Sequence, residues 1–282
     1  KKSDLNRLSK YFDKMGTQEL LEFERAPIET TTLKKIAKKT LKPINRNRPL
    51  ITKERTKYAN VIRKFFKTEK VKMAKQCADM YGKIKKAEGD NPTVDDIINE
   101  LDFQGWSVLV NPTEKTLKKI YKDGSAEALA QISFEDEGIT NLLNEDALSF
   151  AEDRSAAMVG MKYVDGELVP NPDELYAIDD STRDYLRDQI STAIEEGWST
   201  DHLASEIEDG EAFSESRAEM IAQTEIGNAD IQGAMTAYRR SGLVGKKQWV
   251  LGIEHPYEED ECNDNATAGE NKDGIIDFDD VY

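Results

Sequence analysis

The chain has 282 residues, of which 38% are hydrophobic and 33% are charged, and its formal net charge at pH 7 is -16. This length supports one or two domains with a proper core. No run of about 18 apolar residues is present, which excludes a transmembrane helix, and residues 1–20 lack the apolar segment of a secretory signal. The two cysteines, Cys77 and Cys262, are too few and too far apart to indicate a disulfide framework.

Residues 1–88 predict a basic helical arm. Apolar positions at helical spacing indicate helices over residues 4–24 and 30–41, each followed by a proline. After a basic linker at 45–49, a long helix is expected over about 52–87, and at this length it would span roughly 50 Å. Its apolar seam, interrupted by Glu69, consists of Tyr58, Ile62, Phe65, Met73, Cys77, Met80 and Ile84. A single seam with basic outer faces favours a helix that packs on a partner along one side.

Charge is distributed very unevenly along the chain. Residues 1–88 contain 25 Lys and Arg against 10 Asp and Glu, a net charge of +15, and the remainder carries -31. One interpretation is an arm that contacts a polyanion while a body of like charge is held away from it. The other is that the lysines only keep solvent-exposed helices soluble.

Residues 89–178 predict an acidic helical middle region that begins after the boundary at 89–92. Short helices are expected at 93–101, where Thr93 is the cap, and at 113–121 and 125–132. A longer helix is expected at 145–161. The stretch 164–171, with Asp165 and Gly166 at its turn, fits either a small hairpin or a loop.

Residues 179–282 have the clearest start and stop signals. Asp179 or Ser181 is expected to cap a helix that ends at Gly197, and Ser199 to cap the next one, with Trp198 and Leu203 as a hydrophobic staple. A long helix should then run from Ser214 or Ser216 to Ser241 and end at Gly242. Strands are expected near 248–253 and 275–278. The predicted fold class is mainly α, a helical N-terminal arm and helical body with a small β element in the C-terminal domain (α+β).

Arg217, Ile221 and Glu225 stand four residues apart in succession, so they share one face of the long helix. Arg217 and Glu225 are two turns apart, and no glycine-rich phosphate loop or third acid accompanies them. We therefore interpret them as a polar stripe that fixes helix packing and not as a catalytic pair. With His202 and His255 as the two histidines, the sequence supports no nucleophile–histidine constellation.

The segment of residues 197–249 resembles the phage Mu F-like minor head proteins, also called the phage head morphogenesis family. The resemblance extends from about residue 95 and is strongest after 179, where Gly197-Trp198-Ser199 precedes the pattern of the long helix and the tryptophan-containing strand. It implies a structural role for the family-signature residues Trp198, Arg217, Ile221, Thr224, Glu225, Tyr238, Gly242 and Trp249.

The chain departs from the family pattern where a metal site would be expected. Cys262 stands at the first position of the family's Cys-x-x-Cys, but Asn265 occupies the second, and the terminal His-Pro-Asn-Cys-Arg-Cys segment is absent. The residue pattern at 269–280 is similar to that of a calcium-binding loop, but Gly269 stands where the first carboxylate ligand is needed. We therefore predict no metal ligand, no cofactor and no catalytic residue.

The resemblance implies a structural minor capsid protein of a tailed bacteriophage, a virion component assembled in the host cytoplasm. It would lie inside the head at the portal vertex and assist head morphogenesis and genome packaging or DNA ejection. The implied partners are the portal protein, packaged double-stranded DNA bound without sequence preference, and the major capsid or other internal head proteins. No membrane partner is expected. Two alternatives stay open: a phage-delivered enzyme, nucleotide-modifying or metal-dependent, and a free DNA-binding protein.

The basic arm supplies the candidate contacts with DNA or the portal. Lysine and arginine can bind phosphates without reading bases. The candidate residues are Lys34, Lys35, Lys38, Lys39, Lys42, Arg46, Arg48, Lys64, Lys67, Lys70, Lys72 and Lys75.

Overall fold

The computed structural model describes residues 41, 45, 47–85, 93–174, 177–249 and 261–280. Residues 42–242 form one compact unit, and residues 243–280 belong to a second. Each unit is described by itself. The helix predicted at 4–24 lies outside the described residues, as does the helix predicted at 30–41 except for residue 41.

The long helix α4, Pro49–Ile84, confirms the helix predicted over about 52–87. Pro49 fits at its first position because a first-turn N–H needs no partner within the helix. The helix is buried on one side along its length, from Ile51 to Tyr81. The seam differs in detail from the prediction, because Phe66 is fully buried and Phe65 is only partly covered. Glu69, the predicted interruption, is itself buried.

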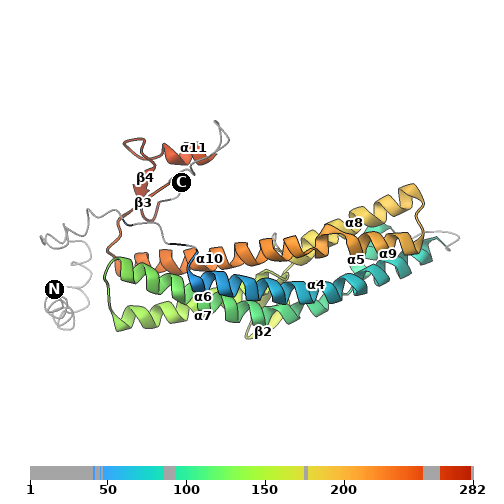
Figure 1. The fold of residues 1–282 in the computed structure, drawn as a ribbon, viewed down its shortest axis with the longest axis horizontal. Helices are drawn as coiled ribbons and strands as arrows, with labels where there is room; N and C mark the ends of the chain where they lie inside the picture. Colours follow the sequence, from blue (N-terminus) through green and yellow to red (C-terminus); the bar gives the residue numbers. More distant parts are fainter. Residues whose placement is uncertain are drawn as a thin grey trace, which may run out of the picture. The chain divides into compact units, whose positions relative to one another are not determined.

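The N-terminal half of α4 packs with two long helices, α6 (Val110–Gln131) and α10 (Glu215–Ser241), and both of these pack with α7 (Glu137–Ala157). The helices α6, α7 and α10 lie side by side in Figure 1. Two short helices were predicted where α6 runs unbroken. Pro112 falls in its first turn, where proline is tolerated. Gly124 lies within it because α10 comes so close that a Cβ there would be 2.3 Å from the Asp230 carbonyl oxygen. The helix therefore needs glycine at this point for packing, not as a stop signal.

The C-terminal half of α4 packs with the shorter elements α5 (Val94–Glu100), α8 (Ile178–Glu196), α9 (Thr200–Asp209) and η2 (Glu211–Phe213). The predicted caps Thr93, Ser199 and Ser214 each accept a hydrogen bond from a backbone N–H of the first turn. Gly197 and Gly242 end their helices in the left-handed conformation, with φ of 71° and 63°. The prediction for the start of α8 was wrong, since Ala177 is the cap and Asp179 lies inside the first turn.

The stretch between α7 and α8 is a hairpin, which settles the alternative left open by the sequence. Strands β1 (Met161–Val164) and β2 (Glu167–Pro170) are antiparallel. Asp165 and Gly166 form the turn with φ of 52° and 82°, as expected for a two-residue hairpin loop. α7 begins eight residues before its predicted start at 145, capped by the Asp136 side chain.

Aromatic side chains form the core where the two halves of α4 meet. Trp106, in η1 (Gln104–Leu109), is 1% exposed, and its ring lies 5.1 Å from Phe65 and 5.4 Å from Phe103. The ring of Phe66 stands edge-on to Phe213, at 5.9 Å. The predicted boundaries at 88 and 178 therefore fall inside one compact unit. The seam of α4 is covered by helices of the same chain, not by another protein.

The second unit contains β3 (Lys246–Gln248), α11 (Glu261–Ala266) and β4 (Ile275–Asp277), with β3 and β4 antiparallel. The strand predicted at 248–253 begins earlier, and residues 250–253 lie outside the described part. The strand predicted near 275–278 is confirmed. The fold class is also confirmed: the chain is mainly helical with small antiparallel sheets.

Candidate functional site

Glu225 of α10 is held by Arg154 of α7. The Arg154 Nε donates to one carboxylate oxygen at 2.8 Å, and an Nη donates to the other at 2.7 Å. The Glu225 side chain is 5% exposed. Such a two-point contact fixes both the spacing and the rotation of the helices that carry it.

Arg217 holds a different junction. One guanidinium nitrogen donates to the Ile178 carbonyl at 2.9 Å and to the Ser181 hydroxyl at 2.7 Å. The other donates to the Thr182 hydroxyl at 2.9 Å and to the Ala212 carbonyl. Burial lowers the pKa of Arg217 to about 10, because desolvation disfavours the charged form. The residue ties the start of α8 and η2 to α10.

The other signature residues divide between packing and surface. Ile221 is buried, Gly242 ends α10, and the Tyr238 hydroxyl donates to Gln131 of α6 at 3.0 Å. The Trp198 ring stacks on His202 with centroids 4.4 Å apart. Thr224 and Trp249 are exposed. The fold thus accounts for most of the signature, but gives Thr224 no packing role.

Arg48 is the clearest correction among the predicted polyanion contacts. Its guanidinium donates to Asp123 of α6 at 2.7 and 2.9 Å, and to Asp230 of α10 at 2.5 Å. Its side chain is 13% exposed. Arg48 therefore anchors the start of α4 and is not available to a phosphate.

The other predicted basic residues fall into three groups. Lys70 donates to the Glu208 carbonyl at 3.0 Å, and Lys72 pairs with Asp102 at 2.9 Å and lies 3.7 Å from Glu69. Lys64, Lys67 and Lys75 are exposed on α4 and form no ion pair with the described residues. The remaining candidates lie outside the described residues: Lys34, Lys35, Lys38, Lys39, Lys42 and Arg46.

Two buried carboxylates were not recognised from the sequence as unusual. Glu69 and Asp179 each have one oxygen without a hydrogen-bond partner among the described residues. Burial raises the pKa of both side chains, since it disfavours the ionised form. The sequence places Glu69 in the apolar seam of α4 and Asp179 near the start of α8, but it does not show that these two acids lose contact with water.

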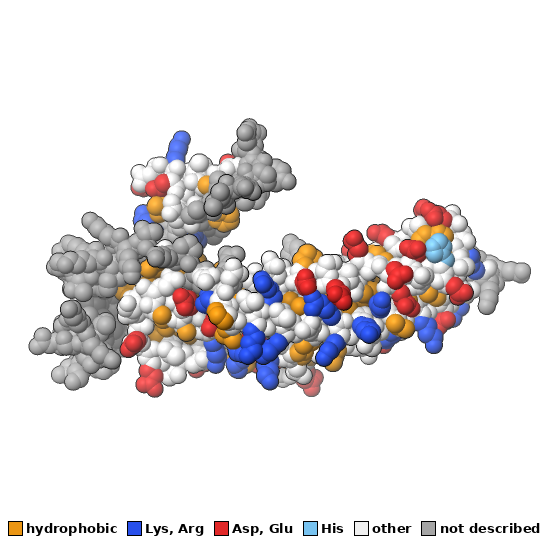
Figure 2. All heavy atoms as spheres, in the orientation of Figure 1, with side chains coloured by type: hydrophobic (Ala, Val, Ile, Leu, Met, Phe, Trp, Pro, Cys, Tyr) orange, Lys and Arg blue, Asp and Glu red, His pale blue; other side chains and the backbone are white. Residues whose placement is uncertain are grey.

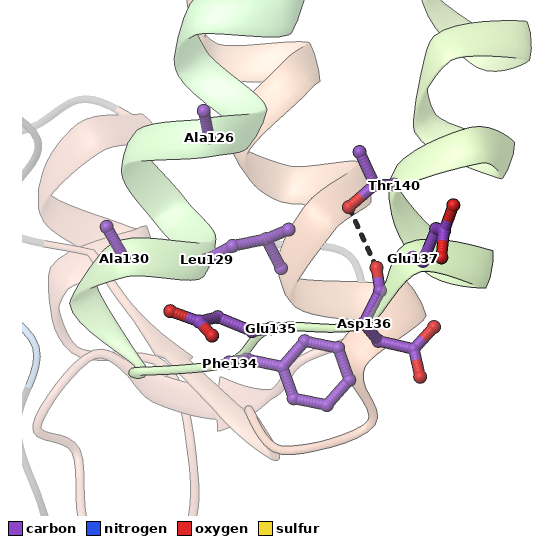
Figure 3. Close-up of a pocket in the computed structure, with 8 residues that line it drawn as sticks. All are labelled: Ala126, Leu129, Ala130, Phe134, Glu135, Asp136, Glu137 and Thr140. Carbon is purple, nitrogen blue, oxygen red and sulfur yellow. Dashed lines mark hydrogen bonds between the residues drawn. The ribbon is translucent and has the colours of Figure 1, made fainter.

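A surface pocket of about 470 Å³ lies at the turn between α6 and α7 (Figure 3). Its apolar lining includes Leu129 and Phe134, and acidic residues stand at the start of α7. Asp136 caps α7 by accepting from the Ile139 N–H at 2.8 Å, and its carbonyl accepts from the Thr140 hydroxyl at 2.8 Å. Carboxylates are favourable at a helix N-terminus. The acids of this pocket thus have a structural explanation.

Within the described part of the chain, no three His, Cys, Asp or Glu side chains gather as a metal-ligand set. None of the described helices has the length and apolarity needed to cross a membrane. His255 and the side chain of Cys262 lie outside what the structure describes.

Comparison of the chain with protein-family models, with curated proteins and with solved structures found no match in any of the three. The resemblance to the Mu F-like proteins therefore stays a prediction from the sequence.

Proposed function

We propose that this chain is a structural minor head protein of a tailed bacteriophage, located inside the head at the portal vertex. It acts by binding other macromolecules and not by transforming a small molecule. Its partners are the portal protein, packaged double-stranded DNA and other head proteins. In this role it assists head assembly and genome packaging or ejection.

One observation carries the proposal. Two charged residues on which the resemblance rests hold neighbouring junctions of α10: Arg217 joins α10 to α8 and η2, and Glu225 joins α10 to α7. Both charges are used to hold helices together. This is the role that a structural module of the resembled family requires of its signature positions.

Mass spectrometry of purified particles tests the location. We expect peptides of this chain in density-purified particles of the phage that encodes it. They should persist after protease treatment of intact particles, since an internal protein is protected by the shell. A major capsid protein and a host cytoplasmic protein serve as internal and contamination controls.

Deletion of the gene tests the role. We expect particles without the protein to package or eject DNA less efficiently. Absence of the chain from intact particles would refute the proposed location. Normal assembly, packaging and ejection in the deletion strain would refute the proposed role.

A further inference from the structure

Five lysines of α4 lie on one exposed side of the helix. Lys53, Lys57, Lys64, Lys67 and Lys75 are separated by four, seven, three and eight residues, and all five are exposed. At 3.6 residues per turn these spacings keep the side chains in one strip. The neighbouring helix α6 has a second exposed row, Lys115, Lys119 and Lys122, with spacings of four and three.

The two rows meet at Glu54. One carboxylate oxygen of Glu54 accepts from Lys57 of α4 at 3.1 Å and from Lys119 of α6 at 2.8 Å. The Glu54 side chain is 9% exposed, and these lysines lower its pKa, Lys119 most strongly. Because this one carboxylate contacts Lys57 and Lys119, the two rows adjoin at this point. We call these eight residues the lysine face; Figure 2 shows Lys and Arg side chains gathered over α4 and α6.

No exposed acid interrupts this surface on its own helices. Between Lys53 and Lys75 the acidic residues of α4 are Glu54 and Glu69, and both are buried; the exposed Asp79 lies one turn beyond the end of the row. In α6 the three acids are only partly exposed, and Asp123 is already bound by Arg48. In a chain with a net charge of -16, a strip of eight exposed lysines concentrates positive charge where a polyanion can approach.

We propose that the lysine face binds the phosphate backbone of duplex DNA without reading its sequence. The α4 row, from Lys53 to Lys75, is about 33 Å long at 1.5 Å per residue. This is close to one turn of the duplex, about 34 Å. The other exposed residues of this strip include Thr56, Asn60 and Thr68. Lysine, threonine and asparagine side chains are common donors to phosphates.

An acidic protein surface fits the lysine face less well. Protein interfaces have an apolar or aromatic centre and are depleted of lysine. Val71, 50% exposed, is the one large apolar side chain of α4 exposed to this extent. The lysine face therefore lacks the centre that a protein partner needs, and DNA is the better ligand.

This inference deepens the proposed function by naming the surface that meets DNA, and its test needs no particle. The full chain is titrated with a duplex of mixed sequence over a salt series. The Lys64→Gln/Lys67→Gln variant is compared with a matched control, Lys83→Gln/Lys162→Gln, which removes two exposed lysines outside the lysine face. None of these four lysines is in an ion pair with the described residues, so each variant should fold.

We expect the face variant to reduce the slope of log affinity against log salt by about 2, and the affinity at 0.1 M salt by roughly 50-fold. The control should stay close to the wild type. An unchanged slope in the face variant would overturn the inference, as binding would then reside elsewhere, for example in the lysines before residue 43. Equal losses in both variants would also overturn it.

Three further outcomes are decisive. If the face variant binds DNA normally but loses binding to purified portal protein, the lysine face is a protein contact and the inference is wrong. If the chain is found in particles but binds no DNA, this inference fails while the proposed location stands. If the chain binds DNA through the lysine face but is absent from particles, this inference stands and the proposed location fails.

Discussion

Glu225 and Arg217 lie two turns apart on α10, and each holds a different neighbour. Glu225 meets Arg154 through two hydrogen bonds, whereas Arg217 binds backbone carbonyls and hydroxyls at the start of α8 and in η2. Arg217 has no carboxylate within ion-pair distance among the described residues. Its charge is stabilised by carbonyl dipoles and by the ring of Phe66, 5.5 Å away. The two residues therefore contribute separately to stability.

Replacing Glu225 with Ala should strongly destabilise the protein, because it leaves the partly buried Arg154 without a carboxylate. We expect a loss of about 3 kcal/mol in the free energy of unfolding, at the low end for a broken buried pair since Arg154 keeps some solvent contact. Urea denaturation followed by circular dichroism measures it. Gln223→Ala, on the exposed side of the same helix, should change stability by less than about 0.5 kcal/mol. Similar effects in both variants would contradict the assigned contact.

Asp179 makes stability depend on pH. Burial raises its folded pKa above 3.8, with help from Asp180 and against the opposing effect of Arg183. The folded state therefore holds the proton to higher pH than the unfolded state, so this group reduces stability as the pH rises through that window. Asp179→Asn should be most stabilising, relative to the wild type, above the folded pKa, and least so near pH 3.

Denaturation of Asp179→Asn and wild type at a series of pH values checks this. Asp188→Asn, an exposed position of the same helix, is the matched control and should show no such trend. An Asp179→Asn benefit that grows as the pH falls would reverse the sign and contradict the argument.

Between elements, the closest packing is that of α6 against α10. A Cβ at Gly233 would lie 2.1 Å from the Tyr121 carbonyl oxygen, and one at Gly124 would lie 2.3 Å from that of Asp230. Between these contacts the Ser125 hydroxyl donates to the Gly233 carbonyl at 3.0 Å. The absence of side chains lets the two backbones approach, and this sets the spacing of the helices around them.

Two glycines of α10 should respond oppositely to alanine. Gly233→Ala forces backbone atoms apart and should lower the free energy of unfolding by about 2 kcal/mol, despite the better helix propensity of alanine. Gly227→Ala meets no atom within 4 Å and should raise it by about 0.5–1 kcal/mol. Thermal unfolding of the two variants provides the comparison. Stabilisation by both would show that the helices separate easily at Gly233.

The sequence correctly predicted those helix ends that depend on a single residue. Ser199 and Ser214 as caps, and Gly197 and Gly242 as terminators, act through their own backbone and side chain, and the structure confirms them. The break predicted inside α6 was wrong because Gly124 is required by close packing against α10, which lies more than 100 residues away in the sequence. Tertiary packing of this kind leaves no periodic signal.

The candidate surface was predictable only in part, for the same reason. Sequence shows that Arg48, Lys64 and Lys72 are basic, but not that Arg48 and Lys72 are bound by carboxylates of other elements while Lys64 is free of the described ones. The α6 lysines were overlooked because their block of sequence is acidic overall. Their proximity to α4 depends on the antiparallel packing of the two helices.

In the molecule as a whole, α4 joins two groups of helices. Its first half packs with α6 and α10, and its second half with α9 and α8. The main core cluster runs from Ile51 to Tyr81 along α4 and reaches residues of both groups. The compact unit of residues 42–242 thus depends on a helix that the sequence placed in a separate arm.

Truncation tests this dependence. A fragment of residues 42–242 should unfold in one cooperative transition, since it keeps α4 and everything packed on it. A fragment of residues 93–242 loses α4, exposes the core cluster, and should bind a hydrophobic dye without cooperative unfolding. Calorimetry and dye fluorescence distinguish the two. A cooperative transition in the shorter fragment would show that the remaining helices fold without α4, as the sequence-based division into an arm and a body predicted.

Cys77 is fully buried in the second half of α4, and burial raises its pKa to about 12. A thiol in this state reacts with alkylating reagents only when the surrounding helices move apart. In a chain whose Cys262 is replaced by Ser, the rate of alkylation at Cys77 therefore reports how often the helices around it open. The same rate can be measured with and without the proposed partners, and no added label is needed.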